Sequence, residues 1–94
     1  RNAPQQEVSQ NKLSWEEQKK RDAERRKIER EVEKLEAEIA ELEAKKAELE
    51  NKMAQPEVYS NGEKAKAVQR EIEEVSNKLE ETNLAWMEKA ELLG

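Results

Sequence analysis

Two ladders of mostly apolar positions run along this chain with the spacing of a coiled coil. The first is Ile28, Val32, Leu35, Ile39, Leu42, Lys46, Leu49 and Met53, and the second is Ala65, Val68, Ile72, Val75, Leu79, Thr82 and Trp86, with Leu93 beyond it. Successive positions are alternately four and three residues apart, which is the 3.5-residue period of packed helices and not the 2-residue period of a strand. The pattern predicts two long helices, each with one stripe that faces a neighbour.

A segment with turn chemistry separates the two ladders. Pro56 lacks the amide proton that would continue the first helix, and it favours an extended backbone at Gln55. Ser60 and Glu63 have the spacing of a capping box, which would start the second helix. We therefore expect helices over about residues 14–54 and 61–93, joined by a turn over residues 55–60.

Folding the chain at this turn predicts how the two ladders pair. Leu49 would lie opposite Ala65, and Arg25, just before the apolar ladder begins, would lie opposite Lys89. The predicted fold is all-α, a two-helix antiparallel intramolecular coiled-coil hairpin. We expect a monomer, because a parallel dimer of the first helix would bring its glutamates together.

The first eleven residues differ from the rest of the chain. They are polar, contain Pro4 and lack the heptad period, as expected of an interdomain linker. Ser14 and Glu17 form a second capping box, so we expect helix to begin near Ser14. The predicted organisation is a flexible linker over residues 1–11 and a hairpin over residues 12–94. Because the chain starts with Arg1 and not with methionine, we expect it to be a segment of a longer protein.

Composition narrows the classes of function. With 44% charged and 34% hydrophobic residues, the chain can fill the seam between two helices but cannot enclose a rounded core. There is no histidine, no cysteine and no phosphate-binding glycine motif, so we predict no catalytic residue, no metal site and no cofactor site in this segment. No apolar run approaches the ~18 residues of a membrane span, and we expect a cytoplasmic protein that does not bind membranes.

Charge is distributed unevenly along the chain. Residues 12–30 contain eight basic and five acidic residues, whereas residues 31–94 contain nine basic and seventeen acidic ones. Clustered basic residues on a helix can follow a nucleic acid backbone without reading its bases. The alternative is a solvated helix end with no partner. The candidate nucleic-acid-binding residues are Lys19, Lys20, Arg21, Arg25, Arg26, Lys27 and Arg30.

Two aromatic positions have both a packing and a binding interpretation. At the tip, which comprises Pro56, Val58 and Tyr59, we favour the interpretation in which Val58 and Tyr59 plug the end of the coil; the alternative is a surface that contacts a partner. Trp86 is interpreted as a packing anchor at the open end of the hairpin, opposite Ile28, with stacking on a base as the alternative.

Three features resemble the C-terminal domain of ABC-F ATPases of the Uup type: KLSWEEQ at residues 12–18, QPEVYS at residues 55–60, and Trp86. The resemblance covers about residues 12–93. It implies that residues 1–11 connect to an ATPase domain, that the parent protein binds ATP, and that it acts at bacterial ribosomes in translation. It also implies that the hairpin contacts DNA or RNA. The chain departs from the family at Lys89, where leucine is frequent, so we expect a less tightly packed open end.

Two other interpretations fit the same residues. In length and charge the chain is also similar to the tRNA-contacting arm of valyl-tRNA synthetase, and a structural spacer that binds a protein partner is a third interpretation. Trp86 and the QPEVYS turn favour the ABC-F resemblance. The expected partner is therefore the ribosome or a nucleic acid, which could be ribosomal RNA, tRNA or DNA.

Overall fold

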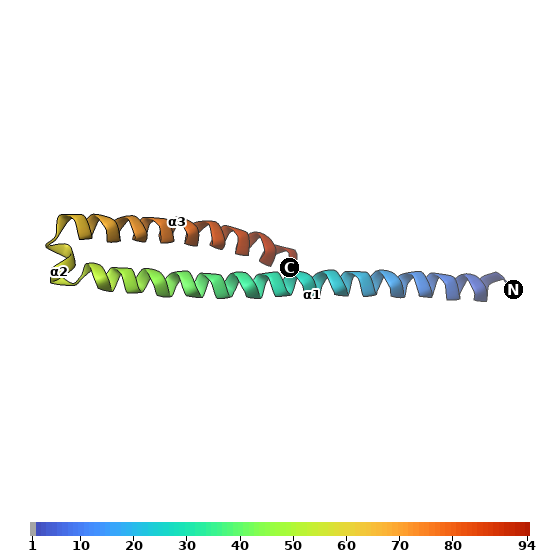
Figure 1. Cartoon of the computed structure of the whole chain (residues 1–94). Coiled ribbons are helices and arrows are strands. Elements are labelled where there is room, and N and C mark those ends of the chain that lie inside the picture. The colour runs from blue at the N-terminus through green and yellow to red at the C-terminus, as the bar shows by residue number, and fades with distance from the viewer. Residues whose placement is uncertain (1) are drawn as a thin grey trace.

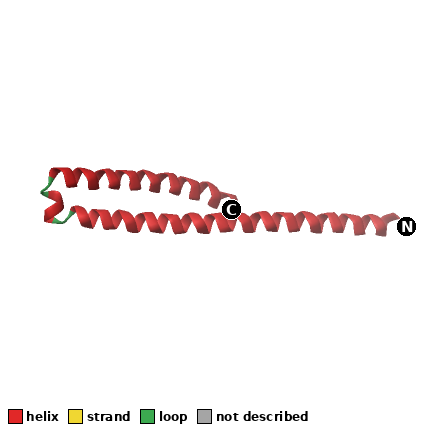
Figure 2. Cartoon of the chain, in the orientation of Figure 1, coloured by secondary structure: helices red, strands yellow, loops and turns green. Residues whose placement is uncertain are grey.

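The chain forms a helical hairpin whose two arms differ in length. The computed structural model describes the backbone of residues 2–94 and the side chains of Lys12 and residues 14–94. Helix α1 spans Asn2–Met53, α2 spans Pro56–Tyr59 and α3 spans Gly62–Leu92. α3 runs antiparallel beside the second half of α1, and α2 lies at the tip between them (Figure 1). Only short loops interrupt the helices (Figure 2). The predicted all-α hairpin is confirmed.

The two predicted ladders are the residues that α1 and α3 bury against each other. Every ladder position from residue 28 to 53, and every one from residue 65 to 93, is buried or partly buried, whereas most residues between them are exposed. The most enclosed positions form a cluster near the tip, the tip cluster, made of Leu49, Val58 and Val68. Thr82 is also buried, and its hydroxyl donates a 2.7 Å hydrogen bond to the carbonyl of Lys78, so this polar group in the seam is satisfied.

The pairing of the two ladders differs from the prediction by about one heptad. Lys89, which was predicted opposite Arg25, has its Nζ 2.8 Å from the Oε2 of Glu31. Arg25 instead donates from Nη2 to the carbonyl of Leu93, at 3.5 Å. Both contacts place α3 further along α1, toward the tip, than the predicted register does.

The packing near the tip shows the same displacement. Ile72 and Val75 both pack against the tip cluster. Val75 lies seven residues, or about 10 Å along the helix, from Val68, so the member of the cluster that Val75 reaches is Leu49. Leu49 therefore faces the stretch around Ile72 and not Ala65, which corrects the predicted register.

An extra helical turn explains the correction. Gln55 is extended (φ −75°, ψ 130°), as its position before proline predicts, but Pro56 then starts α2 and does not remain in a loop. α2 adds residues to the first arm before the chain reverses. The N-cap of α3 is Asn61, whose side chain accepts a 3.2 Å hydrogen bond from the amide of Lys64. The predicted cap, Ser60, instead donates to the carbonyl of Pro56 and closes α2.

α1 begins at Asn2 and not near Ser14, so the predicted capping box at Ser14 and Glu17 lies inside the helix. No glycine or proline interrupts residues 5–53, and Pro4 falls in the first helical turn, where its missing amide proton removes no hydrogen bond. A linker role for residues 1–11 stays a prediction. Over residues 2–94, no helix combines the length and the apolar character that crossing a membrane requires.

Candidate nucleic-acid interface

α1 extends well beyond the end of α3, because α1 has 52 residues and α3 has 31. The carbonyl of Leu93, just after α3 ends, lies at Arg25, and all side chains of residues 14–27 are exposed. We refer to residues 12–24 of α1 as the overhang. No other helix of the chain covers the overhang over the residues that the structure describes (Figure 1).

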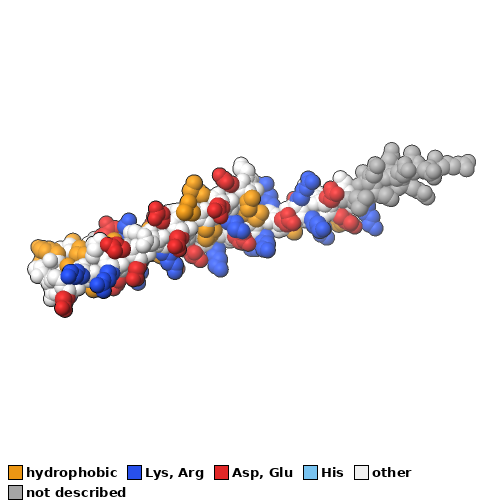
Figure 3. Space-filling view, turned by 90° about the horizontal axis from the view of Figure 1, so that it is seen from above, with side chains coloured by type: hydrophobic (Ala, Val, Ile, Leu, Met, Phe, Trp, Pro, Cys, Tyr) orange, Lys and Arg blue, Asp and Glu red, His pale blue; other side chains and the backbone are white. Residues whose placement is uncertain are grey.

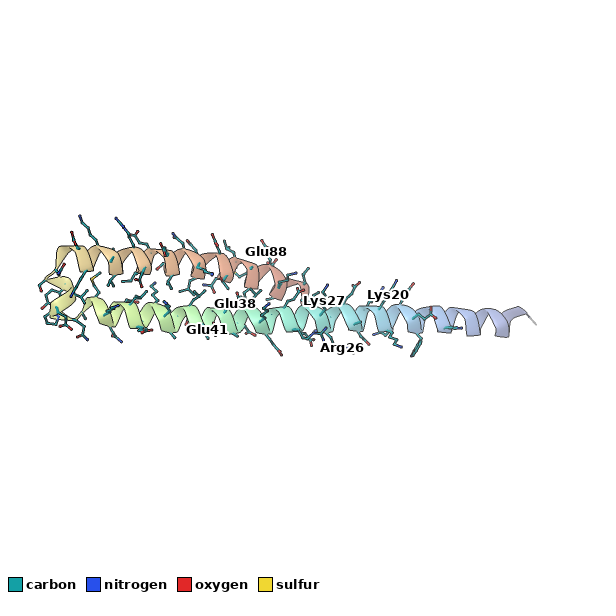
Figure 4. The ribbon with its side chains drawn as sticks, viewed as in Figure 1. Lys20, Arg26, Lys27, Glu38, Glu41 and Glu88 are labelled. Atoms are coloured by element: carbon teal, nitrogen blue, oxygen red, sulfur yellow. The ribbon has the colours of Figure 1, made fainter. Side chains whose placement is uncertain are left out.

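The seven predicted basic residues are all exposed, but they do not form one face. With 3.6 residues per turn, they divide into three groups around α1. Lys19, Arg26 and Arg30 lie on the side away from the seam, Lys20 and Lys27 lie on one flank, and Arg21 and Arg25 continue the direction of the seam. Figure 4 shows Lys20 and Lys27 on one side of the ribbon and Arg26 on the other.

One face of the helix nevertheless gathers four cations and an aromatic ring. We call it the outer stripe, and it consists of Lys12, Trp15, Lys19, Arg26 and Arg30. Acidic side chains flank this stripe, and basic and acidic groups are interspersed over the face of the rod seen in Figure 3. The outer stripe is therefore a local basic surface on a rod of mixed charge.

Arg25 has a structural role that the sequence did not reveal. Its Nε lies 3.3 Å from Glu29 Oε1, and its Nη2 donates to the Leu93 carbonyl at the end of α3. A cation at a helix C-terminus satisfies free carbonyls and interacts favourably with the helix dipole. Arg25 thus contacts the C-terminal end of α3, and this distinguishes it from the other six candidates.

Glu31 and Lys89 form an ion pair near the open end of the hairpin. Their ion pair bridges α1 and α3, and both side chains remain partly exposed. The hydrogen bond from Lys89 lowers the pKa of Glu31 below its ordinary value, and the charges of Lys89 and Lys27 act in the same direction. In the sequence, only Lys89 pointed to this pair, because it places a charged residue where leucine is frequent in the family that the chain resembles.

Val58 and Tyr59, which we predicted to plug the end of the coil together, differ in how far they are buried. Val58 is 6% exposed and plugs the end of the coil beside Met53, which confirms that half of the prediction. Tyr59 is 59% exposed, so the prediction that it helps to plug the coil is wrong. Consecutive residues on a helix point about 100° apart, so α2 can direct only one of the two side chains inward. Pro56 is exposed as well.

Trp86 lies in the seam. It is partly buried, and its Nε1 is enclosed without a hydrogen-bond partner among the described residues. It lines the same groove as Ile39 and Asn83, which agrees with the packing interpretation but places the ring further toward the tip than Ile28. Stacking of Trp86 on a base would require the seam to open.

The rest of the described surface shows neither a catalytic site nor a metal site. The grooves beside the seam are shallow and open to solvent, and the described side chains form no evident catalytic arrangement. Among the described residues, no three histidine, cysteine, aspartate or glutamate side chains are grouped so that they could hold a metal ion.

The fold and its surface define a class of protein: an elongated accessory module that presents a charged helical rod. Residues 23–91 match the family model described as the ABC transporter C-terminal domain, and the chain belongs to this family. The domain is typical of ABC-F proteins of the Uup type, so it is an accessory domain of an ABC ATPase, as the resemblance implied. Comparisons with curated proteins and with solved structures gave no match. The KLSWEEQ segment lies before the matched residues.

Proposed function

We propose that this domain binds the phosphate backbone of a nucleic acid through the basic residues around the overhang, as the accessory arm of a cytoplasmic ABC-F ATPase that acts at the ribosome. The observation that supports the proposal is the end of α3 at Arg25. It leaves α1 exposed on all sides from residue 14 to residue 27. A ligand can therefore approach Lys19, Lys20 and Arg26 without displacing another part of the chain.

The charge distribution favours this end of the rod over the rest. Residues 12–30 carry a net charge of +3, from eight basic and five acidic groups, and residues 31–94 carry −8, from nine basic and seventeen acidic groups. The acidic part repels phosphates, so the local field directs a nucleic acid to residues 12–30. Their excess of positive charge lies in residues 25–30, where the overhang ends, because residues 12–24 hold four basic and four acidic residues. Because the contacts are to phosphates, the proposed binding depends little on base sequence and strongly on salt.

The test is a fluorescence-anisotropy titration of labelled RNA and duplex DNA at several salt concentrations. The variant replaces Lys19, Arg26 and Arg30 with glutamine, which removes three cations from the outer stripe. Each cation that neutralises a phosphate contributes about 0.7 to 0.9 to the slope of log affinity against log salt, so we expect this slope to flatten by about 2 to 3.

The matched control replaces three exposed cations of the acidic part, Lys64, Lys66 and Lys78, with glutamine. It changes the net charge equally but should leave the salt slope nearly unchanged. Circular dichroism checks that both variants keep their helicity. If the wild-type chain binds neither ligand at low salt, or if the two variants weaken binding equally, the proposal is wrong.

The same titrations distinguish the other interpretations. The family match favours an ABC-F parent over a valyl-tRNA synthetase arm. Titration with tRNA, ribosomal RNA fragments and DNA separates the candidate ligands within the proposal. Absence of binding to all of them would favour a spacer that contacts a protein partner, for which Tyr59 offers an exposed aromatic side chain at the tip.

A further inference from the structure

Trp15 is a large aromatic side chain that the fold does not use. It is 62% exposed, and it lies on the overhang, ten residues before the point where α3 ends at Arg25. Its position on α1 is on the side away from the seam, so extending α3 would not cover it. Packing within this chain therefore does not account for Trp15.

Along the outer stripe the neighbours of Trp15 are the cations Lys12 and Lys19, and acidic side chains flank the stripe. The Nζ of Lys19 lies 5.0 Å from the centroid of the indole ring, within the range of a cation–π contact. Lys12, Lys19 and Arg26 follow one another at seven-residue spacing on the same face, so this line of charge extends over about 21 Å. A flat aromatic surface between regularly spaced cations matches the two parts of an unpaired nucleotide, a base that stacks and a phosphate that carries charge.

We propose that Trp15 stacks on an unpaired base while the cations of the outer stripe contact the neighbouring phosphates, so that the domain prefers single-stranded segments to duplex. This inference rests on the proposed function and specifies its ligand. In a duplex the base faces are already stacked on one another, and only the phosphates and groove edges are offered to an exposed indole. A preference for single strands is thus the property that Trp15 adds to simple attraction by charge.

The test uses the whole 94-residue chain with two probes, a labelled single-stranded oligouridylate and a blunt RNA duplex of the same length. Loss of a base-stacking aromatic weakens single-strand binding by roughly 5- to 160-fold, and we expect Trp15→Ala to fall in this range while duplex binding changes less than about twofold. Trp15→Phe keeps a stacking ring and should restore most of the affinity.

The matched control is Leu84→Ala, which removes another large exposed apolar side chain, 58% exposed, from the outer face of α3. It should change neither affinity. Intrinsic fluorescence gives an independent measurement. In a Trp86→Phe background, in which Trp15 is the only tryptophan, the single strand should quench the emission of Trp15 and reduce its further quenching by iodide.

The outcomes separate this inference from the proposed function. If neither probe binds, both fail. If both probes bind and Trp15→Ala weakens them equally or not at all, the phosphate-binding function stands and the stacking inference is overturned. If vesicles that contain phosphatidylserine shift the emission of Trp15 to the blue while the oligonucleotide does not change it, Trp15 inserts into an anionic surface and the inference is also overturned.

Discussion

Leu49, Val58 and Val68 are the most enclosed apolar side chains of this domain. They are only 5–6% exposed, and no large described side chain is fully buried. A pair of helices encloses each seam residue from one side only, so most ladder positions keep some contact with water. Three of the five buried side chains lie where α2 closes the seam, because α2 adds a third wall, and the other two, Leu79 and Thr82, lie further along α3.

Replacing Leu49 with alanine should therefore destabilise the domain strongly. The substitution removes a side chain that is 5% exposed, and deleting such a group costs about 2 to 5 kcal/mol through lost transfer free energy and the cavity that remains. The same substitution at Leu84, which is 58% exposed, should cost under about 1 kcal/mol. Urea unfolding followed by helicity measures both; equal losses would contradict the assignment of the seam.

The ion pair between Glu31 and Lys89 should make the stability of the open end depend on pH. Because the folded-state pKa of Glu31 is lowered, its contribution is present above the ordinary glutamate pKa of 4.5 and is lost as the pH falls through the folded value. Glu31→Gln should reduce the melting temperature at neutral pH, and the difference from wild type should vanish in acid.

The control for this effect is Glu33→Gln, two residues away on α1. Glu33 is exposed and makes no ion pair among the described side chains. Its difference from wild type should stay small across the same pH range. A pH-independent difference for Glu31→Gln would show that the ion pair does not stabilise the folded state. Added salt should also weaken the effect, because the pair is partly exposed.

At the level of elements, α2 determines how the two long helices pair. The heptads specify which face of each helix is buried, and the structure buries those faces. They do not specify the register, because sliding one helix by a whole heptad returns every ladder residue to an equivalent position. Register depends on where the chain reverses. The short helix Pro56–Tyr59 prolongs the first arm within the predicted turn and so moves the point of reversal toward α3.

Engineered disulfides should distinguish the two registers, and the chain contains no cysteine that would interfere. Leu49→Cys combined with Ile72→Cys should oxidise readily, because these positions face each other in the structure. Leu49→Cys combined with Ala65→Cys should not form an intramolecular disulfide, because seven residues of displacement separate the sites by about 10 Å. Efficient closure of the second pair alone would restore the register predicted from sequence.

For the candidate interface, too, the sequence predicts only part of what the structure shows. The composition of residues 12–30 predicts its location, and the structure shows that all seven candidate cations are exposed. Arg25 was counted with the others because nothing in the sequence showed that the C-terminus of α3 would meet its guanidinium. Tyr59 was placed with Val58 because the short helix that separates their directions was not expected.

At the scale of the whole molecule, the hairpin is a thin rod of 88 × 15 × 14 Å with a radius of gyration of 24.3 Å. A compact domain of this length would have a radius of gyration of about 12 Å. Small-angle scattering should therefore give a value near 24 Å that does not change with concentration, together with the mass of a monomer, 11.0 kDa. A doubled scattering mass would contradict the predicted monomer.

The unequal lengths of the two arms give this rod a mechanical property. Near the tip the rod is two helices thick, whereas the overhang is a single helix, so bending stiffness falls sharply at Arg25. A rotation of about 15°, the size of known rigid-body subunit rotations, would carry the far end of an 88 Å lever through about 20 Å. A small rotation at one end of the rod is therefore a large displacement at the other, and a ligand bound along the single helix would stiffen the thinner section of the rod.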